Sequence, residues 1–148
     1  MGRASVKRIL KIATDLHNAL YRKSGGKFAG NIANLPILLI TTYGRTSGQP
    51  HTNPVVYIKD GQDYLVSATN GGAPVNPNWY LNLKARPQAR IEVGIEAFNV
   101  DATIAEGDER TRLYEIFKAA SSNFVKYEKG TSRVLPVIRL TPGTTAEA

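Results

Sequence analysis

Residues 43–54 read Tyr-Gly-Arg-Thr-Ser-Gly-Gln-Pro-His-Thr-Asn-Pro, and residues 70–84 read Asn-Gly-Gly-Ala-Pro-Val-Asn-Pro-Asn-Trp-Tyr-Leu-Asn-Leu-Lys. Both stretches are glycine-bearing polar loops, and they lie on either side of one predicted β-hairpin. Glycine allows backbone N–H groups to turn outward and approach a ligand without an intervening Cβ. Arg45 and His51 add side chains that can carry positive charge, and Trp79 adds a large flat ring. The loops therefore predict a cradle for an anionic ligand with a planar ring system.

The segments around these loops are patterned as β-strands, with apolar or alternating residues between turn signals. Asp60-Gly61 is a strong short-range signal for a two-residue hairpin turn, and Gly94 marks a second hairpin. Short antiparallel connections favour a mainly β fold with flanking helices, a compact antiparallel barrel of about six strands rather than a Rossmann sheet. The predicted strands are residues 35–43, 52–59, 63–69, 89–93, 97–105 and 134–140.

Two short stretches beside the strands are predicted to be helical. Asn76 and Pro77 are typical of a helix cap and a first helical residue, and this helix must stop before Pro87. A second helix begins at the acidic pair 108–109 and carries an apolar stripe. Residues 121–132 are predicted to be a loop that carries two aromatic side chains.

Residues 3–22 form a basic amphipathic helix, with an apolar stripe on one face and cations opposite. A glycine-containing connector over residues 24–34 is expected to let this helix lie apart from the body. The predicted domain organisation is therefore an N-terminal arm at residues 1–27, a barrel domain at residues 28–142 and a disordered tail at residues 143–148.

The composition of the 148-residue chain excludes several kinds of site. There is no cysteine, which excludes a disulfide framework, thiolate metal ligands and a cysteine nucleophile. The two histidines have no metal-ligand spacing, so no metal site is predicted. No apolar run reaches membrane-spanning length and no cleavable leader is visible, which favours a cytoplasmic protein.

Positive charge is concentrated at the N-terminus. The net charge of the chain is +7, and residues 1–27 contribute +6, with Asp15 as their one acidic residue. A basic amphipathic helix favours an anionic membrane surface, here the inner face of the cell membrane. Packing on the same protein or on a partner subunit is the alternative, so a homodimer stays open. Nucleic acid is disfavoured because no reader motif accompanies the basic patch.

Residues 38–87 resemble the deazaflavin-dependent nitroreductase family. The resemblance is carried by Thr-Thr-Tyr-Gly-Arg-Thr-Ser-Gly-Gln-Pro at 41–50, Asn-Gly-Gly-Ala-Pro at 70–74 and Asn-Pro-Asn-Trp-Tyr-Leu-Asn-Leu-Lys-Ala-Arg-Pro at 76–87. It implies an FMN-binding-like split β-barrel that binds the 8-hydroxy-5-deazaflavin coenzyme, coenzyme F420, and uses its reduced form as a hydride donor. Members of the family reduce quinones and, in some cases, nitroaromatic or other enone-type compounds.

The resemblance also assigns site residues by position. The coenzyme's phosphate and polyglutamate side falls on the first loop, at Arg45, Thr46, Ser47 and His51. The tricyclic ring falls on one strand and the second loop, supported by a tryptophan and an asparagine: Asn53, Pro54, Val55, Val56, Thr69, Asn70, Gly71, Gly72, Trp79 and Asn82. The substrate side is Ser121, Phe124 and Tyr127.

Tyr127 is the candidate catalytic residue, as a proton donor to the reduced product with solvent water as its rival. Trp79 has a second interpretation, as a core residue that packs beneath the site. Both interpretations are left open by the sequence.

The chain departs from the family at Thr46, His51 and Asn70, where relatives commonly carry lysine or arginine. Losing cationic partners weakens the hold on a polyanionic coenzyme. The leading hypothesis is hydride transfer to a quinone-like or other activated-alkene or nitro acceptor near the membrane. Two alternatives remain: a non-catalytic split-barrel binder of a lipid or apolar ligand, and an FMN-dependent oxidoreductase, because related split barrels bind FMN.

Overall fold

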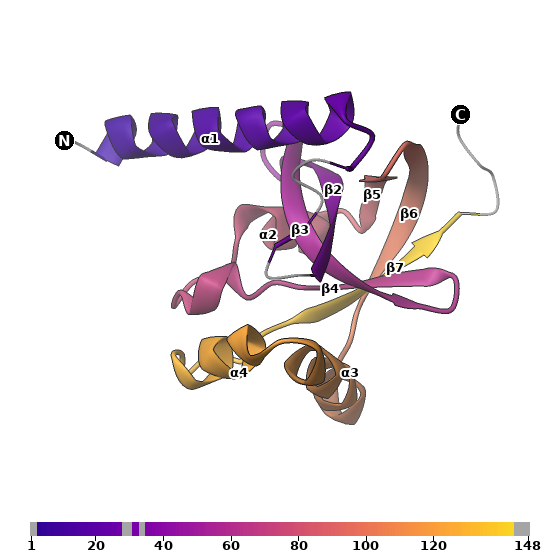
Figure 1. The fold of residues 1–148 in the computed structure, drawn as a ribbon. Helices are drawn as coiled ribbons and strands as arrows, with labels where there is room; N and C mark the ends of the chain where they lie inside the picture. The colour runs from indigo at the N-terminus through magenta and orange to yellow at the C-terminus, as the bar shows by residue number, and fades with distance from the viewer. Residues whose placement is uncertain (1–2, 28–30, 33–34, 144–148) are drawn as a thin grey trace.

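The structure is a computed structural model that describes residues 3–27, 31–32 and 35–143 (Figure 1). Its centre is a closed antiparallel barrel in which the strands follow the order β2-β3-β4-β7-β6-β5, and pairing between β2 and β5 closes the ring. A two-residue strand, β1 (Asn31–Ile32), pairs with the start of β2. The predicted six-stranded antiparallel barrel is therefore confirmed. Its strands are β2 (Leu35–Tyr43), β3 (Pro50–Asp60), β4 (Asp63–Ser67), β5 (Gln88–Val93), β6 (Glu96–Ile104) and β7 (Val137–Pro142).

Both predicted hairpins are present. In the β3–β4 hairpin Asp60 pairs with Asp63, so the turn residues are Gly61 and Gln62 and the turn lies one residue later than predicted. Gly61 has a φ of +61°, in the left-handed region that such turns require and that glycine adopts readily. The β5–β6 hairpin turns at Gly94 as expected.

Strand β2 closes the barrel, because it pairs with β3 on one side and with β5 on the other. Residues 37–42 of this strand are all buried, which explains why its sequence is a nearly continuous apolar run. Side chains from every barrel strand and from helix α2 (Asn78–Ala85) close the core. Helix α2 thereby fixes one end of the barrel next to the polar loop that follows β2.

Helix α2 begins one residue later than predicted, because Pro77 is its cap and Asn78 its first residue. The side chain of Asn76 does not cap the helix; its Oδ1 accepts a hydrogen bond from Arg133 at 2.6 Å. The helix ends at Ala85, before Pro87, as expected.

The prediction of a loop at residues 121–132 is wrong for most of its length. Residues Ser122–Lys129 form helix α4, which follows directly on α3 (Gly107–Ala120). The Oγ of Ser121 accepts a hydrogen bond from the N–H of Asn123 and caps α4, while the ring of Phe124 packs against those of Tyr114 and Phe117. Tertiary packing of this aromatic face stabilises a helix too short to form by itself.

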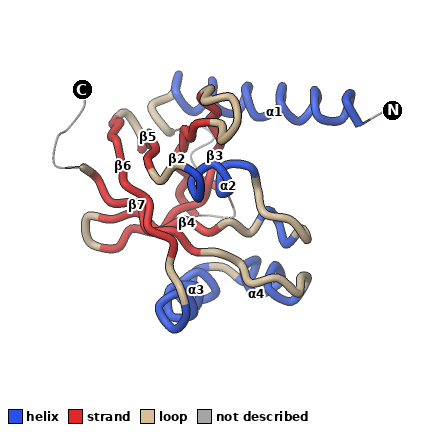
Figure 2. Tube along the Cα trace, turned by 180° about the vertical axis from the view of Figure 1, so that it is seen from behind, coloured by secondary structure: helices blue, strands red, loops and turns tan. Residues whose placement is uncertain are grey.

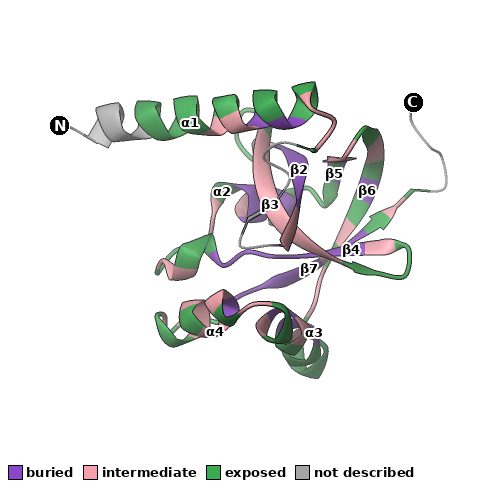
Figure 3. Ribbon diagram, viewed as in Figure 1, coloured by how far each residue is buried: buried purple, intermediate pink, exposed green. Residues whose placement is uncertain are grey.

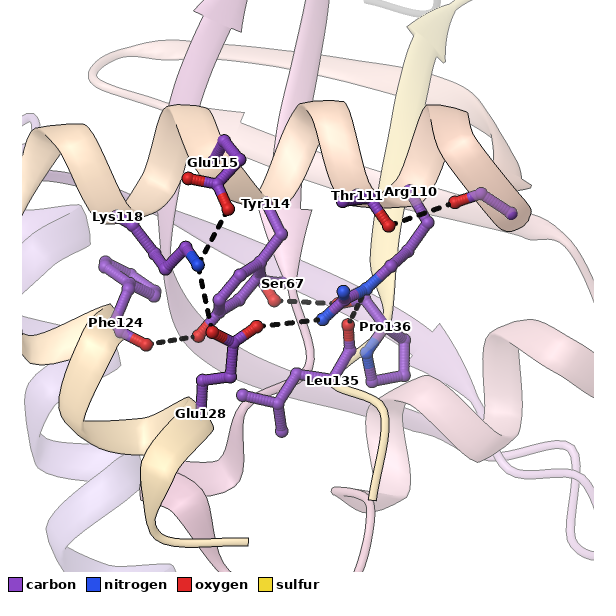
Figure 4. Close-up of polar contacts among 11 residues, drawn as sticks. Ser67, Arg110, Thr111, Tyr114, Glu115, Lys118, Phe124, Glu128, Leu135 and Pro136 are labelled. Atoms are coloured by element: carbon purple, nitrogen blue, oxygen red, sulfur yellow. Dashed lines mark hydrogen bonds and ion pairs between the residues drawn. The ribbon is translucent and has the colours of Figure 1, made fainter. Parts of the chain in front are cut away.

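Polar contacts lock α3, α4 and the strand that follows them (Figure 4). The hydroxyl of Tyr114 donates to the carbonyl of Phe124 at 2.6 Å, and burial raises the pKa of Tyr114 to about 12. Lys118 bridges to Glu128 at 2.9 Å. Side chains occupy the carbonyls just before β7: Arg110 donates to that of Leu135, and Ser67 donates to that of Pro136. Strand β7 begins at Val137, three residues later than predicted.

Helix α1 (Arg3–Lys23) lies across the barrel at the end opposite α3 and α4 (Figures 1 and 2). The expectation that it lies apart from the body is wrong for its last turns. The hydroxyl of Tyr21, a residue only 2% exposed, donates to the carbonyl of Ile37 and accepts from the N–H of Gly94. Arg22 forms a bidentate ion pair with Glu92, with both N···O distances 2.9 Å.

Most of α1 before Asn18 is exposed (Figure 3), and its apolar stripe lies on the side of the helix opposite the buried Asn18 and Tyr21. Ile9, Ile12 and Leu16 are 52%, 60% and 59% exposed. This is the reverse of the usual arrangement, in which an amphipathic helix buries its apolar stripe against its own domain. Within the described ranges, no helix has both the length and the apolar character needed to span a membrane. Residues 144–148 of the predicted tail lie outside the described residues.

Candidate functional site

Two adjoining hollows lie between α1, the barrel and α4. The first, which we call the long groove, has a volume of about 1110 Å³ and runs between α1, the loop after β2 and the start of α2. The second, the inner cavity, has a volume of about 390 Å³ and lies between β3, the loop after β4 and α4. Thr14, Asn53 and Trp79 line both hollows, so together they form one continuous cleft.

The structure gathers the residues predicted for the site into this cleft, and it sorts them by position. The long groove is lined by Arg45, Thr46, Ser47, His51, Asn53, Trp79 and Asn82. The inner cavity is lined by Asn53, Pro54, Val55, Val56, Thr69, Asn70, Gly71, Trp79, Ser121, Phe124 and Tyr127. Gly72 is the exception, because it lines neither hollow; a Cβ added to it would be 3.2 Å from the Cα of Tyr127.

Asn82 is placed beneath Arg45 rather than beside the inner cavity. Its Oδ1 accepts from the backbone N–H of Arg45 at 3.2 Å and from the guanidinium Nη1 at 2.9 Å, while its Nδ2 donates to Thr42 Oγ1. Asn82 is only 3% exposed, whereas Arg45 is exposed at the groove. A guanidinium held in this way remains accessible to an anion and has donors suited to bidentate contacts with phosphate or carboxylate.

Trp79 is both a core residue and part of the lining of the cleft. It is 7% exposed and belongs to the main core cluster, but it also lines both hollows. The tryptophan therefore packs beneath the cleft and presents a limited part of its surface to it at the junction of groove and cavity.

The loop after β4 has a backbone that few residue types adopt. Asn70, Gly71 and Gly72 have φ values of +48°, +64° and +82°, all in the left-handed region. The Nδ2 of Asn70 donates to the carbonyl of Val75 at 3.1 Å, which closes the loop on itself. Asn70 thus has a structural role at a position where the family resemblance leads one to expect a cation.

Arg133 is the residue that sequence reasoning missed. Its guanidinium donates to the carbonyls of Ala68, Thr69 and Ala73 and to Oδ1 of Asn76, so it ties together both ends of the loop after β4. Burial lowers the pKa of Arg133, and the nearby Tyr80 opposes this shift. No sequence signal identifies such a residue, because three of its four partners are backbone carbonyls about sixty residues away in sequence.

The three predicted substrate-side residues differ in burial and in whether their polar groups are already hydrogen-bonded. Phe124 is 6% exposed and packs among the rings of α3 and α4, and Ser121 Oγ is engaged as a helix cap. Tyr127 is half-buried, and its ring meets that of Phe124 edge to face at 5.6 Å. Within the described residues the hydroxyl of Tyr127 makes no hydrogen bond, so the side chain can present this group to the cavity.

Helix α1 supplies a wall of the long groove that the sequence did not predict. Asn18 is only 5% exposed; its Nδ2 donates to the carbonyl of Thr52 at 3.0 Å. Within the described residues its Oδ1 has no hydrogen-bond partner. Buried polar atoms are nearly always paired, so this oxygen is an unsatisfied acceptor beneath the wall of the groove.

Comparisons with known proteins agree with this geometry. The family model described as F420H2-dependent quinone reductase matches residues 14–142. An F420H2-dependent quinone reductase of Mycobacterium tuberculosis is 38% identical over 130 residues, which are 85% of this chain and 87% of the relative.

Two solved structures are similar to the whole or most of the fold. A protein described as a domain-swapped dimer is 27% identical with a TM-score of 0.67, covering 93% of this chain and 95% of its own. The structure of an F420-H2 dependent reductase, FDR-A, is 31% identical with a TM-score of 0.65, covering 71% of this chain and 93% of its own.

Proposed function

Because this chain belongs to the F420H2-dependent quinone reductase family, we propose that it transfers a hydride from the reduced 8-hydroxy-5-deazaflavin coenzyme to a quinone-like acceptor. It is a deazaflavin-dependent reductase, and its coenzyme is coenzyme F420. Other activated alkenes and nitro compounds are further acceptors to test.

The continuity of the cleft is the observation that carries the proposal. The long groove and the inner cavity join at Thr14, Asn53 and Trp79, so one elongated ligand can occupy both. The exposed guanidinium of Arg45 gives the groove a cationic group that can pair with phosphate or carboxylate. The inner cavity has an apolar strand segment on one side and an aromatic residue of α4 on the other. These features fit a coenzyme with an anionic chain and a planar ring.

The protein's part in the reaction is to bind the coenzyme and to orient its ring. Arg45, itself held by Asn82, would bind phosphate, and the strand at residues 53–56 with the loop at residues 69–71 would hold the ring. The bound coenzyme supplies the hydride, so the site needs no nucleophile or paired carboxylates. The hydrogen bonds of Arg133 hold the loop after β4, and the packing of Phe124 on Phe117 holds α4, so these two sides of the inner cavity keep a fixed separation.

Tyr127 is proposed as the proton donor to the reduced acceptor. It stands on a helix that is capped and packed, which gives its hydroxyl a defined position. Tyr127→Phe should lower kcat by about 10²-fold if the hydroxyl donates the proton, with the Kd of the coenzyme unchanged. An unchanged kcat would assign the proton to water.

Anaerobic mixing of the reduced coenzyme with menadione tests the main proposal through the absorbance of the oxidised deazaflavin. We expect enzyme-dependent oxidation, slowed in Arg45→Gln and restored in part in Arg45→Lys. The absence of oxidation with any of several quinones would contradict the proposal. Native mass spectrometry of the same preparation distinguishes the two alternatives, because a co-purified lipid or FMN would be seen directly.

We further propose that residues 1–27 attach a barrel domain of residues 28–142 to an anionic membrane surface from the cytoplasmic side. The support is the outward apolar stripe of α1, with the exposed cations Arg8 and Lys23 beside it. A peripheral position would bring the cleft close to lipid-soluble quinones.

Sedimentation with vesicles of anionic lipid tests the membrane proposal. Ile12→Asp with Leu16→Asp should abolish sedimentation, while a variant of equal charge change on the barrel, Thr103→Asp with Gln62→Asp, should not. Deletion of residues 1–27 is unsuitable, because it removes the buried Tyr21. If the wild type instead forms a dimer that the α1 variant dissociates, a second copy covers the stripe and the membrane proposal fails.

A further inference from the structure

Polar side chains of α1 recur every three or four residues along the long groove: Lys11, Asp15, Asn18 and Arg22. This spacing places them in one stripe on the helix. We propose that the stripe is a binding wall for the anionic part of the coenzyme, its phosphate and carboxylate groups, and that Lys11 supplies a cation which the first loop lacks. The inference rests on the proposed function and concerns residues of this chain outside the predicted site.

The wall has a fixed position. Asn18 donates to the carbonyl of Thr52 on β3, and Arg22 holds Glu92 on β5 in a bidentate pair. Tyr21 is buried between them with hydrogen bonds to both edges of the β2–β5 junction. Residues 18–22 are therefore part of the barrel's surface, and the helix extends from them along the groove.

The opposite wall is short of positive charge. The first loop carries Thr46 and His51 at positions where the family resemblance leads one to expect cations, and Arg45 is its one guanidinium. Both walls face the same hollow. A cation on α1 would therefore act on the same ligand groups as Arg45, from the other side.

Lys11 is available to a ligand because its present partner is weakly held. Its Nζ lies 2.7 Å from Oδ2 of Asp15, and the two side chains are 75% and 58% exposed. Exposed pairs of this kind contribute little to stability and exchange readily. Asp15 itself opposes an anionic ligand, so it limits affinity at this wall. Arg22 is committed to Glu92 and serves mainly to anchor the helix.

Two single substitutions should therefore shift coenzyme affinity in opposite directions. Asp15→Asn removes the repulsion and frees Lys11, and it should lower the Kd of the oxidised coenzyme about threefold to fivefold. Lys11→Gln should raise that Kd by a similar factor. Lys84→Gln is the matched control, because Lys84 is an exposed cation of α2 that lines neither hollow.

The measurement is a fluorescence or calorimetric titration of the protein with oxidised coenzyme, repeated with the deazaflavin riboside that has no phosphate or glutamate. The proposal expects opposite shifts for the full coenzyme, no shift for the riboside and no shift in Lys84→Gln. Equal shifts with the riboside, or none with the coenzyme, would overturn it while leaving the proposed function intact. If the wild type binds no coenzyme, the proposed function fails together with the inference.

Discussion

Helices α1 and α4 form opposite sides of the same cleft, but they are held by different forces. Helix α4 turns its aromatic face inward, where Phe124 packs against Tyr114 and Phe117. Helix α1 turns its apolar stripe outward and is held by polar contacts of Asn18, Tyr21 and Arg22. Helix α4 is therefore part of the hydrophobic core, whereas α1 is attached to the barrel with its apolar surface available to a partner.

The largest expected effect is on the free energy of unfolding, which should depend strongly on the apolar face of α4 and weakly on that of α1. Phe124→Ala removes a buried ring and should lower the free energy of unfolding by about 3–5 kcal/mol, whereas Ile12→Ala should change it by less than about 0.5 kcal/mol. Urea unfolding of both variants measures this. A loss of similar size for Ile12→Ala would show that the stripe of α1 is buried in solution.

Arg133 connects the α4 side of the cleft to the loop after β4. Arg133→Met leaves three carbonyls and one amide oxygen without their donor and should cost about 2–4 kcal/mol of stability, with coenzyme affinity reduced as well. Arg133→Lys keeps the charge but not the planar fork, so it should recover only part of either property. Full recovery of coenzyme affinity by lysine would contradict the role of the fork geometry.

Tyr21 tests how firmly α1 is held. Tyr21→Phe removes the hydroxyl that bonds Ile37 and Gly94 and should lower the free energy of unfolding by about 1–2 kcal/mol. Hydrogen exchange should then be faster in the last turns of α1 than in α4. Uniformly faster exchange across the barrel would show that α1 and the barrel unfold as one unit.

Tyr114 makes the α4 side sensitive to alkaline pH. Its pKa is raised by burial to about 12, so the folded state binds the phenolic proton more tightly than the unfolded chain does. The resulting stability is complete below about pH 10 and is lost as the pH rises toward 12. Tyr114→Phe should be less stable at neutral pH and should lose less stability over this interval. If Tyr114→Phe loses as much stability as the wild type over this pH interval, the loss comes from other groups.

Much of the fold could be predicted because its signals are local. The alternating strands, the Gly61 and Gly94 turns and the stop before Pro87 follow from short stretches of sequence. The short helix α4 was missed because its stability comes from rings contributed by α3. Arg133 was missed because most of its partners are backbone carbonyls, which every residue has, so the sequence does not show which of them it will contact.

The strand pattern could be predicted from the sequence alone, as could the two glycine loops and the amphipathic character of residues 3–22, because backbone preferences and hydrophobic periodicity act over a few residues. Two features become visible only in the folded chain: the two loops meet in one cleft, and α1 presents its polar stripe to that cleft. Those features depend on contacts such as Tyr21 with Ile37 and Arg22 with Glu92, which join segments far apart in the chain. The orientation of an amphipathic helix is fixed by what its ends contact, and the periodicity of its sequence is the same whichever face turns inward.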